Sequence, residues 1–555
     1  MSRRAAVPLA IGKILPQTQN PEKTMSLNAL SRSLLAGVAL AMLLGISGRQ
    51  AHAQSASAIP SLGGDMMEIR TERKLGDRIA RDLYRDPDFI DDVLLEYYVE
   101  AIWRRLIEAA RRRGDLPEEL YREFSWKILL GKDRTINAFA LPGGYFGLHL
   151  GMIAAIESSS ELAAVLAHEL AHASQRHLYR LTARQERLAP WMIGAFILGT
   201  IAANRNADAA NAIVLGGQAA GLQTQLNFSR DMEREADRIA LGILQDAGFA
   251  TAGMVSMFEK LQSANQLNDS GAFPYLRTHP LTTDRIGDMR ARIGISGSGG
   301  KRFDLEASLM ATRASILSRT YASNTNQLPR VARNQATNPK EQLIVHRYGT
   351  ALEATLSGER DNSELILPEI DEQASDKDEK AWLINLVWAE LDLNVGRYAD
   401  ANERLTRLTR MPEPGKRPVL LLKIQSMLGK QTDESRKRAR ELLRLWLSEH
   451  ADDAAAWQLM VKTQTELNEP IAAIRAEAEV RMARLDYIGA LDRYKAAIRL
   501  STESETVRVD QIELAVVETR MRDAQAKIAE QEAGQSRPFR SPQSHLRALT
   551  PEQPL

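Results

Sequence analysis

Apolar residues recur at helical spacing along most of the chain, and only one short region has the pattern of strands. Positions 65–113 mix charged and apolar residues with a helical period, which predicts helices packed on a core. Three short apolar runs follow at 126–130, 136–140 and 145–149, separated by turn residues, and they predict a small antiparallel sheet. Beyond this region the pattern is again helical. The expected fold is therefore mainly α, with an α+β first part.

A helix is predicted to begin directly after the last of these runs. Ser158 and Glu161 have the spacing of a capping box, which opens a helix. The apolar stripe of this helix consists of Leu162, Val165, Leu166 and Leu170. The same helix carries His168-Glu169-Leu170-Ala171-His172, a His-Glu-x-x-His motif.

The motif combines metal binding with acid–base chemistry. Residues four apart share a helix face, so His168 and His172 can direct their imidazoles at one metal ion. Zinc held in this way activates water and polarises a peptide carbonyl. Glu169 would take the proton of the water and pass it to the leaving amine. The alternative interpretation is an ordinary amphipathic helix that carries two histidines four residues apart.

A zinc site of this kind needs a third protein ligand. A second polar helix is predicted around Ser229–Asp237. Its acidic side chains are Asp231, Glu233, Glu235 and Asp237. Local chemistry does not choose among these four carboxylates.

The motif helix followed by Glu233-Arg234-Glu235-Ala236-Asp237 resembles the gluzincin metallopeptidases that include the CAAX prenyl proteases and heat-shock protease X. The resemblance implies a zincin-like domain that binds one Zn²⁺ ion per chain. It also implies that Glu233 is the third ligand and that Asp237 supports a ligand histidine, one helical turn away. Glu235 is then expected to point elsewhere, toward solvent.

Further motifs narrow the resemblance to one periplasmic branch, the β-barrel assembly-enhancing proteases. They are Ile136-Asn137-Ala138-Phe139-Ala140, Gly143-Gly144 and Arg277-Thr278-His279-Pro280-Leu281, and the match covers about residues 65 to 295 well. The resemblance implies a helical-repeat second half and a combined protease and chaperone role in assembly of outer-membrane β-barrels. The strand at 136–140 could pair with an extended substrate, or it could belong to a purely structural hairpin.

His279 lies in a Thr-His-Pro turn that the resemblance places near the zinc cleft. It could occupy the open metal position as a gate, donate a hydrogen bond to the oxyanion, or be a structural loop histidine. His149 and His177 have no partner at metal-ligand spacing and are expected to be structural.

Composition excludes several classes of function. The chain has 72 basic and 71 acidic residues, so it has no basic field for a nucleic acid. It has no cysteine, which excludes disulfides, thiolate zinc ligands and a cysteine nucleophile. Metal ligands must therefore be histidines and carboxylates.

The N-terminal region predicts export to the periplasm. Residues 34–46 are almost continuously apolar, Arg32 precedes them and Ala51-His52-Ala53 follows. This order is typical of a signal peptide, which we place at 25–53, and the apolar run is shorter than the ~20 residues of a membrane span. Residues 1–24 are interpreted as an extension ahead of the native start. An uncleaved anchor is the alternative.

The remaining segments complete the predicted domain organisation. A linker at 54–64 precedes a metalloprotease domain at 65–294. Within that domain, 190–203 and 209–222 predict a helical hairpin that covers the site or touches a membrane surface, or a plain pair of core helices. A Gly- and Ser-rich linker at 295–301 ends the domain.

The second half is predicted to be a tetratricopeptide-like solenoid at 302–530, followed by a disordered tail at 531–555. The evidence is the spacing of Gly396, Tyr398 and Ala401 and that of Tyr487, Ala490, Tyr494 and Ala497. A generic helical bundle is the alternative.

Together these features predict a periplasmic zinc endopeptidase. Its expected substrates are unfolded or misassembled envelope proteins, and its expected partner is the outer-membrane β-barrel assembly machinery, with possible peripheral membrane contact. The competing hypothesis is a chaperone or scaffold whose repeats act while the metal site is vestigial.

Overall fold

The computed structural model describes residues 62–183, 229–267, 274–294, 304–320, 339–358, 382–408, 415–503 and 510–535. These residues belong to one compact unit that begins at Leu62. Among them, no helix combines the length and apolar character needed to cross a membrane. Several predicted segments lie outside the described residues: 1–24, 25–53, the linker residues 54–61, 190–203, 209–222, 295–301 and the tail after 535. The boundary between protease and repeat domains therefore stays a prediction.

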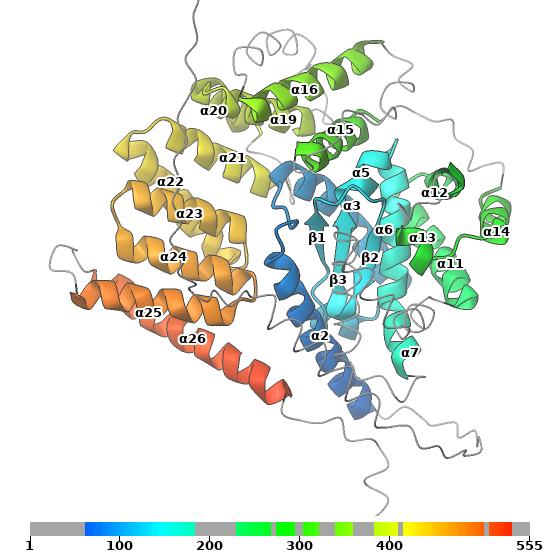
Figure 1. The fold of residues 1–555 in the computed structure, drawn as a ribbon, viewed down its shortest axis with the longest axis horizontal. Coiled ribbons are helices and arrows are strands. Elements are labelled where there is room, and N and C mark those ends of the chain that lie inside the picture. The colour runs from blue at the N-terminus through cyan, green and yellow to red at the C-terminus, as the bar shows by residue number, and fades with distance from the viewer. Residues whose placement is uncertain are drawn as a thin grey trace, which may run out of the picture. The chain divides into compact units, whose positions relative to one another are not determined.

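Helices make up most of the described chain (Figure 1). Up to residue 294 they are α2 (Leu62–Tyr84), α3 (Val93–Arg113), α4 (Glu118–Glu123), α5 (Leu150–Ala155), α6 (Ser159–Ser174), α7 (His177–Ala183), α11 (Arg230–Asp246), α12 (Ala252–Leu267), α13 (Pro274–Thr278) and α14 (Thr283–Ile293). After residue 303 they are α15 (Leu305–Thr320), α16 (Pro339–Ser357), α19 (Trp382–Asn394), α20 (Tyr398–Arg407), α21 (Lys416–Gly429), α22 (Asp433–Glu449), α23 (Ala454–Glu466), α24 (Pro470–Ala483), α25 (Tyr487–Glu503) and α26 (Gln511–Gln535).

The predicted sheet is present, but its topology is mixed rather than antiparallel. Its strands are β1 (Lys127–Gly131), β2 (Ala138–Leu141) and β3 (Tyr145–His149), in the order β1-β3-β2. β2 and β3 form an antiparallel hairpin, whereas β1 runs parallel to β3 on its other edge. β3 occupies the centre of the sheet and pairs with both neighbours, and it is buried at all five positions. Apolar patterning marks strands but does not specify which edge each one joins, so the prediction missed this parallel pair.

The hairpin turn explains the Gly143-Gly144 motif. Both glycines have positive φ, 71° and 76°, which residues with a side chain rarely adopt. A Cβ on Gly144 would also lie 2.7 Å from the Cβ of Phe124. The turn therefore requires glycine, and it fixes β2 as an edge strand beside α6.

Helix α6 lies at the centre of the first half of the fold. It contacts β2, α3, α11 and α12, and its side chains from Glu161 to Ser174 are all buried. A helix buried on every side can carry polar residues only where they find partners. The two histidines and the glutamate of the motif therefore need polar partners within the core.

The second half consists of antiparallel helices that contact one another in chain order, from α19 to α26 (Figure 1). Gly396 has a φ of 86° in the turn between α19 and α20, and Ala401 is fully buried behind it. On α25, Ala490, Tyr494 and Ala497 are buried on one face. This arrangement confirms a mainly helical fold with a region of stacked helices, and the tetratricopeptide class of the repeats stays a prediction.

Candidate metal centre

The cap of helix α6 forms as the sequence predicts. Ser158 precedes the helix with extended backbone, and its hydroxyl accepts a hydrogen bond from the amide of Glu161 at 3.3 Å. The Glu161 carboxylate in turn binds Lys260 of α12, which secures the start of the helix within the fold. Because its start is fixed, the helix presents His168, Glu169 and His172 in the core, each about 1% exposed.

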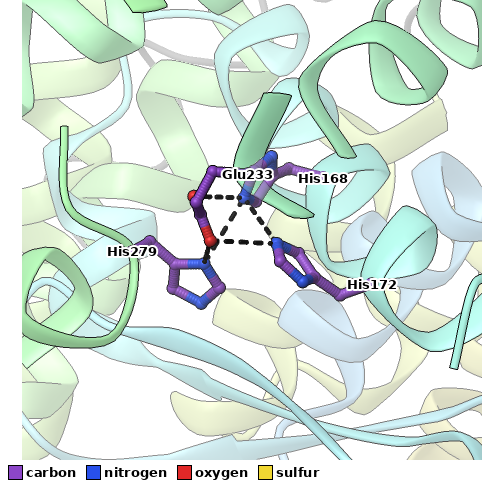
Figure 2. Close-up of side chains that lie close together, drawn as sticks. All are labelled: His168, His172, Glu233 and His279. Atoms are coloured by element: carbon purple, nitrogen blue, oxygen red, sulfur yellow. Dashed lines mark hydrogen bonds and ion pairs between the residues drawn. The ribbon is translucent and has the colours of Figure 1, made fainter. Parts of the chain in front are cut away.

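The two motif histidines and Glu233 converge on one point (Figure 2). The Nε2 atoms of His168 and His172 are 3.0 Å apart. Glu233 reaches them from α11, with its Oε2 3.5 Å from His168 Nε2 and its Oε1 3.4 Å from His172 Nε2. Ser229 caps α11 by accepting from Met232 N, so this helix also begins at a fixed place.

His279 completes this group from the turn after α13. Its Nδ1 lies 3.0 Å from Glu233 Oε1 and 3.4 Å from His168 Nε2. One ligand atom from each of the four side chains lies within 4.8 Å of those of the other three. The ring of Tyr275 stacks on His279 with centroids 4.8 Å apart, which helps to hold the imidazole in place.

Glu169 lies beside this group. Its Oε2 accepts a hydrogen bond from the backbone amide of Ala140 in edge strand β2, at 3.0 Å. Its Oε1 is buried without a hydrogen-bond partner among the described residues, 3.5 Å from His279 Nε2. Burial raises the pKa of Glu169, while the neighbouring imidazoles of His279 and His168 oppose the rise. A carboxylate with a raised pKa and a vacant oxygen suits a proton acceptor.

The charges in the site favour a cation. Burial lowers the pKa of His168, but its contacts with Asp237 and Glu233 outweigh that effect and raise it to about 9. For Glu233, contacts with three imidazoles outweigh burial and lower its pKa well below the usual value. Two imidazole nitrogens and a carboxylate form a donor set that fits a divalent metal. The metal would take the place of the proton that these side chains otherwise bind.

Asp237 lies beside the ring of His168. Its Oδ1 is 3.1 Å from His168 Nδ1, on the side of the ring away from the ligand cluster. Arg285 of α14 holds the same carboxylate through two hydrogen bonds, at 2.7 and 2.8 Å, and its Nη1 is 2.7 Å from Glu233 Oε2. Arg285 also donates to the carbonyl of Pro280, beside His279. No local sequence pattern links this arginine to the motif, so it could not be predicted from the sequence.

One expectation about a neighbouring residue is corrected. Glu235 does not point to open solvent: its side chain is 29% exposed and its Oε2 contacts His177 Nε2 at 3.2 Å and Arg180 at 3.1 Å. His177, expected to be structural, lies beside the centre, and its Nδ1 is 3.0 Å from the Nδ1 of His172. The contacts of Glu235 depend on how α7 lies against α11, and the contact of His177 with His172 depends on how α7 lies against α6; sequence spacing alone specifies neither. His149 contacts Thr135 and Phe139, away from the cluster.

The chain is similar in sequence to known metallopeptidases. The model of peptidase family M48 matches residues 95–293. The β-barrel assembly-enhancing protease of Escherichia coli (strain K12) is 30% identical over 499 residues, which cover 87% of this chain and 96% of the relative. The relative of the same name from Yersinia pestis is 28% identical over 82% of this chain and 91% of its own length. The mitochondrial metalloendopeptidase OMA1 of Saccharomyces cerevisiae is 32% identical over 201 residues, 35% of this chain and 55% of its own.

The first of these similarities extends over nearly the whole chain, beyond the segment that the family model matches. The buried His-Glu-x-x-His helix, with Glu169 on it, and Glu233 on a second helix all lie within the matched segment. This protein is therefore a metalloendopeptidase, and it belongs to peptidase family M48.

Proposed function

We propose that this protein is a zinc-dependent endopeptidase of the periplasm that cleaves misassembled envelope proteins and takes part in quality control of outer-membrane β-barrel assembly. The convergence of His168, His172 and Glu233 beside a buried carboxylate carries the proposal. Two histidines and a glutamate are a common ligand set of catalytic zinc sites, and zinc, when bound, would polarise a peptide carbonyl and activate water. The names of the relatives support a role in barrel assembly.

Each side chain then has a defined task. His168, His172 and Glu233 hold the metal, and Asp237 orients His168 through its Nδ1. Glu169 accepts the proton of the attacking water at its vacant Oε1 and later delivers it to the leaving amine. A carboxylate in this position completes acid–base catalysis without being a metal ligand.

The edge of β2 that pairs with no other described strand would hold the substrate. β2 is at the edge of the sheet, and an extended peptide can add to such an edge through backbone hydrogen bonds. The amide of Ala140 on this edge also donates to Glu169, so a peptide paired with β2 would lie next to the base. This proximity favours the substrate-binding interpretation of the strand over a purely structural hairpin.

His279 is proposed to gate the metal. Its Nδ1 lies within the ligand group, which favours a gate over an oxyanion donor. With the imidazole on the metal, the enzyme would rest until substrate or a partner draws the turn away. His279→Ala should then increase casein digestion with nearly unchanged zinc content. A loss of about a hundredfold would identify an oxyanion donor instead, and an unchanged rate would reject both roles.

The stacked helices after residue 303 are proposed to be tetratricopeptide repeats that bind substrates or the barrel assembly machinery. The alternative is a chaperone or scaffold with a vestigial metal site. The ligands and the base are all present, which argues against a vestigial site.

The decisive experiment measures zinc content and casein digestion by the purified mature protein, with and without a chelator. Chelation should abolish digestion, and zinc should restore it. Mature protein without bound zinc or activity would favour the scaffold. N-terminal sequencing of periplasmic material should find a start near Gln54, and a start at residue 1 or 25 would reject the proposed export.

A further inference from the structure

We propose that His177 and Glu235 position the metal ligand His172, so that a His–His–Glu chain supports this side of the metal centre. The inference rests on the zinc centre proposed above and assigns a task to two residues that the catalytic scheme does not use. Its basis is a continuous line of two contacts, from the ligand ring to His177 and from His177 to a partly exposed carboxylate.

The two nitrogens of His172 face different surroundings. Nε2 points into the ligand cluster, 3.0 Å from His168 Nε2 and 3.4 Å from Glu233 Oε1. Nδ1 points away from the cluster and lies 3.0 Å from His177 Nδ1. Nε2 is therefore the atom available to a metal, and Nδ1 is the atom through which the protein can orient the ring.

The contact between the two Nδ1 atoms constrains which ring nitrogens of His172 and His177 carry a proton. Two ring nitrogens can form a hydrogen bond only if one donates and the other accepts. If His172 Nε2 offers its lone pair to a metal, the neutral ring carries its proton on Nδ1, and this N–H donates to His177. His177 must then carry its own proton on Nε2. One pattern of protons thus satisfies the pair and leaves the ligand atom free.

Glu235 selects that pattern. Its Oε2 lies 3.2 Å from His177 Nε2, and an ionised carboxylate oxygen can only accept. Arg180 donates to the same oxygen at 3.1 Å, which keeps the carboxylate charged and directed at the ring. His177 is fully buried, so both contacts lie inside the fold. The carboxylate therefore fixes the proton on His177 Nε2, and His177 Nδ1 remains an acceptor for His172.

The two motif histidines are thus supported in different ways from the same helix. Asp237 on α11 reaches His168 directly, with Arg285 behind it. Glu235, on the opposite side of α11, reaches His172 only through the ring of His177. Helix α11 would supply the third ligand and the carboxylates that orient both of the others.

The test measures zinc affinity of the full-length mature protein by competition with a chelating dye, independently of activity. His177→Ala should weaken zinc binding by about 10–100-fold, the usual cost of losing a partner that orients a ligand. His177→Asn should recover most of the affinity, because its amide oxygen can accept near the place of Nδ1. Glu235→Gln should weaken binding by less than His177→Ala, and should add little to the loss in a His177→Ala background.

Asp231→Asn is the matched control, since Asp231 is on the same helix, is 91% exposed and pairs with Arg234. Its zinc affinity should equal that of the wild type. Equal losses in His177→Ala and His177→Asn, or full affinity in a folded His177→Ala protein, would overturn the positioning role. Wild-type protein that binds no zinc would instead reject the centre itself, so the two failures are distinguishable.

Discussion

The metal centre and the network around Arg313 both bury charged side chains, but they differ in how those charges are satisfied. Arg313 of α15 donates to the carboxylates of Asp92 and Glu390 and to the hydroxyl of Tyr348, at 2.6–3.0 Å. Each carboxylate there already has a guanidinium opposite it. At the metal centre Arg285 pairs with Asp237 and with Glu233 Oε2, but lone pairs from α6, α11 and the His279 turn still converge on one another.

This difference shows which buried charges point to chemistry. Arg313 is 4% exposed and joins α15 to the cap of α3 and to α19, so its network holds helices together. Converging acceptors repel one another unless a proton or a cation lies between them. The arrangement of the metal centre therefore favours binding of a cation, whereas the Arg313 network is already neutralised internally and links helices of the fold. Substitutions in the two regions should alter different measurements.

The largest expected effect is on catalysis at the metal centre. Glu169→Gln should lower casein digestion by roughly 10²–10⁴-fold, because the amide cannot accept a proton. Zinc content should remain at the wild-type level, since Glu169 is not among the proposed ligands. Zinc-loaded variant with wild-type activity would show that another group is the base.

Glu233→Gln should act on metal binding. Loss of the carboxylate should weaken zinc binding by more than about a hundredfold. This loss is larger than the one expected when a residue that only orients a ligand is removed. Glu235→Gln should have a much smaller effect in the same chelator competition. The opposite ranking would mean that the third ligand is two residues further along α11.

Arg313→Met should act on stability instead. The substitution leaves Asp92 and Glu390 buried without a guanidinium, which costs about 3–5 kcal/mol in the free energy of unfolding. Urea denaturation measures it. Adding Asp92→Asn and Glu390→Gln should recover most of the loss, because the uncompensated charges are then gone. A triple variant as unstable as the single one would mean that packing, not charge, dominates there.

The smallest effect is expected at an exposed pair. Lys127 at the start of β1 lies 2.6 Å from Asp452, and the two side chains are 40% and 68% exposed. Lys127→Gln should lower the free energy of unfolding by less than about 1 kcal/mol, because water screens such pairs. The difference from wild type should vanish near 1 M salt, where the Debye length is about 3 Å. If Lys127→Gln lowered the free energy of unfolding as much as Arg313→Met, the expected difference between buried and exposed ion pairs would be wrong.

Some of these features could be predicted from the sequence, because they depend on short spacings. Ser158 and Glu161 cap a helix because they are three residues apart, and His168 and His172 share a face because they are four apart. The Gly143-Gly144 turn follows from the φ values that only glycine adopts readily. The roles of Glu233 and Asp237 could be assigned only from the resemblance to a family, because local sequence does not distinguish among four acidic residues on the same helix.

The tertiary structure alone decided which distant residues meet. Arg285 reaches Asp237 from 48 residues away, and Glu235 reaches His177 from 58 residues away. The parallel pairing of β1 with β3 is of the same kind, because it depends on which edge of the central strand remains free. Local sequence determines the helix face on which a side chain lies. Tertiary packing determines which residues that face contacts. The contacts across the whole core must together leave few buried charges unpaired.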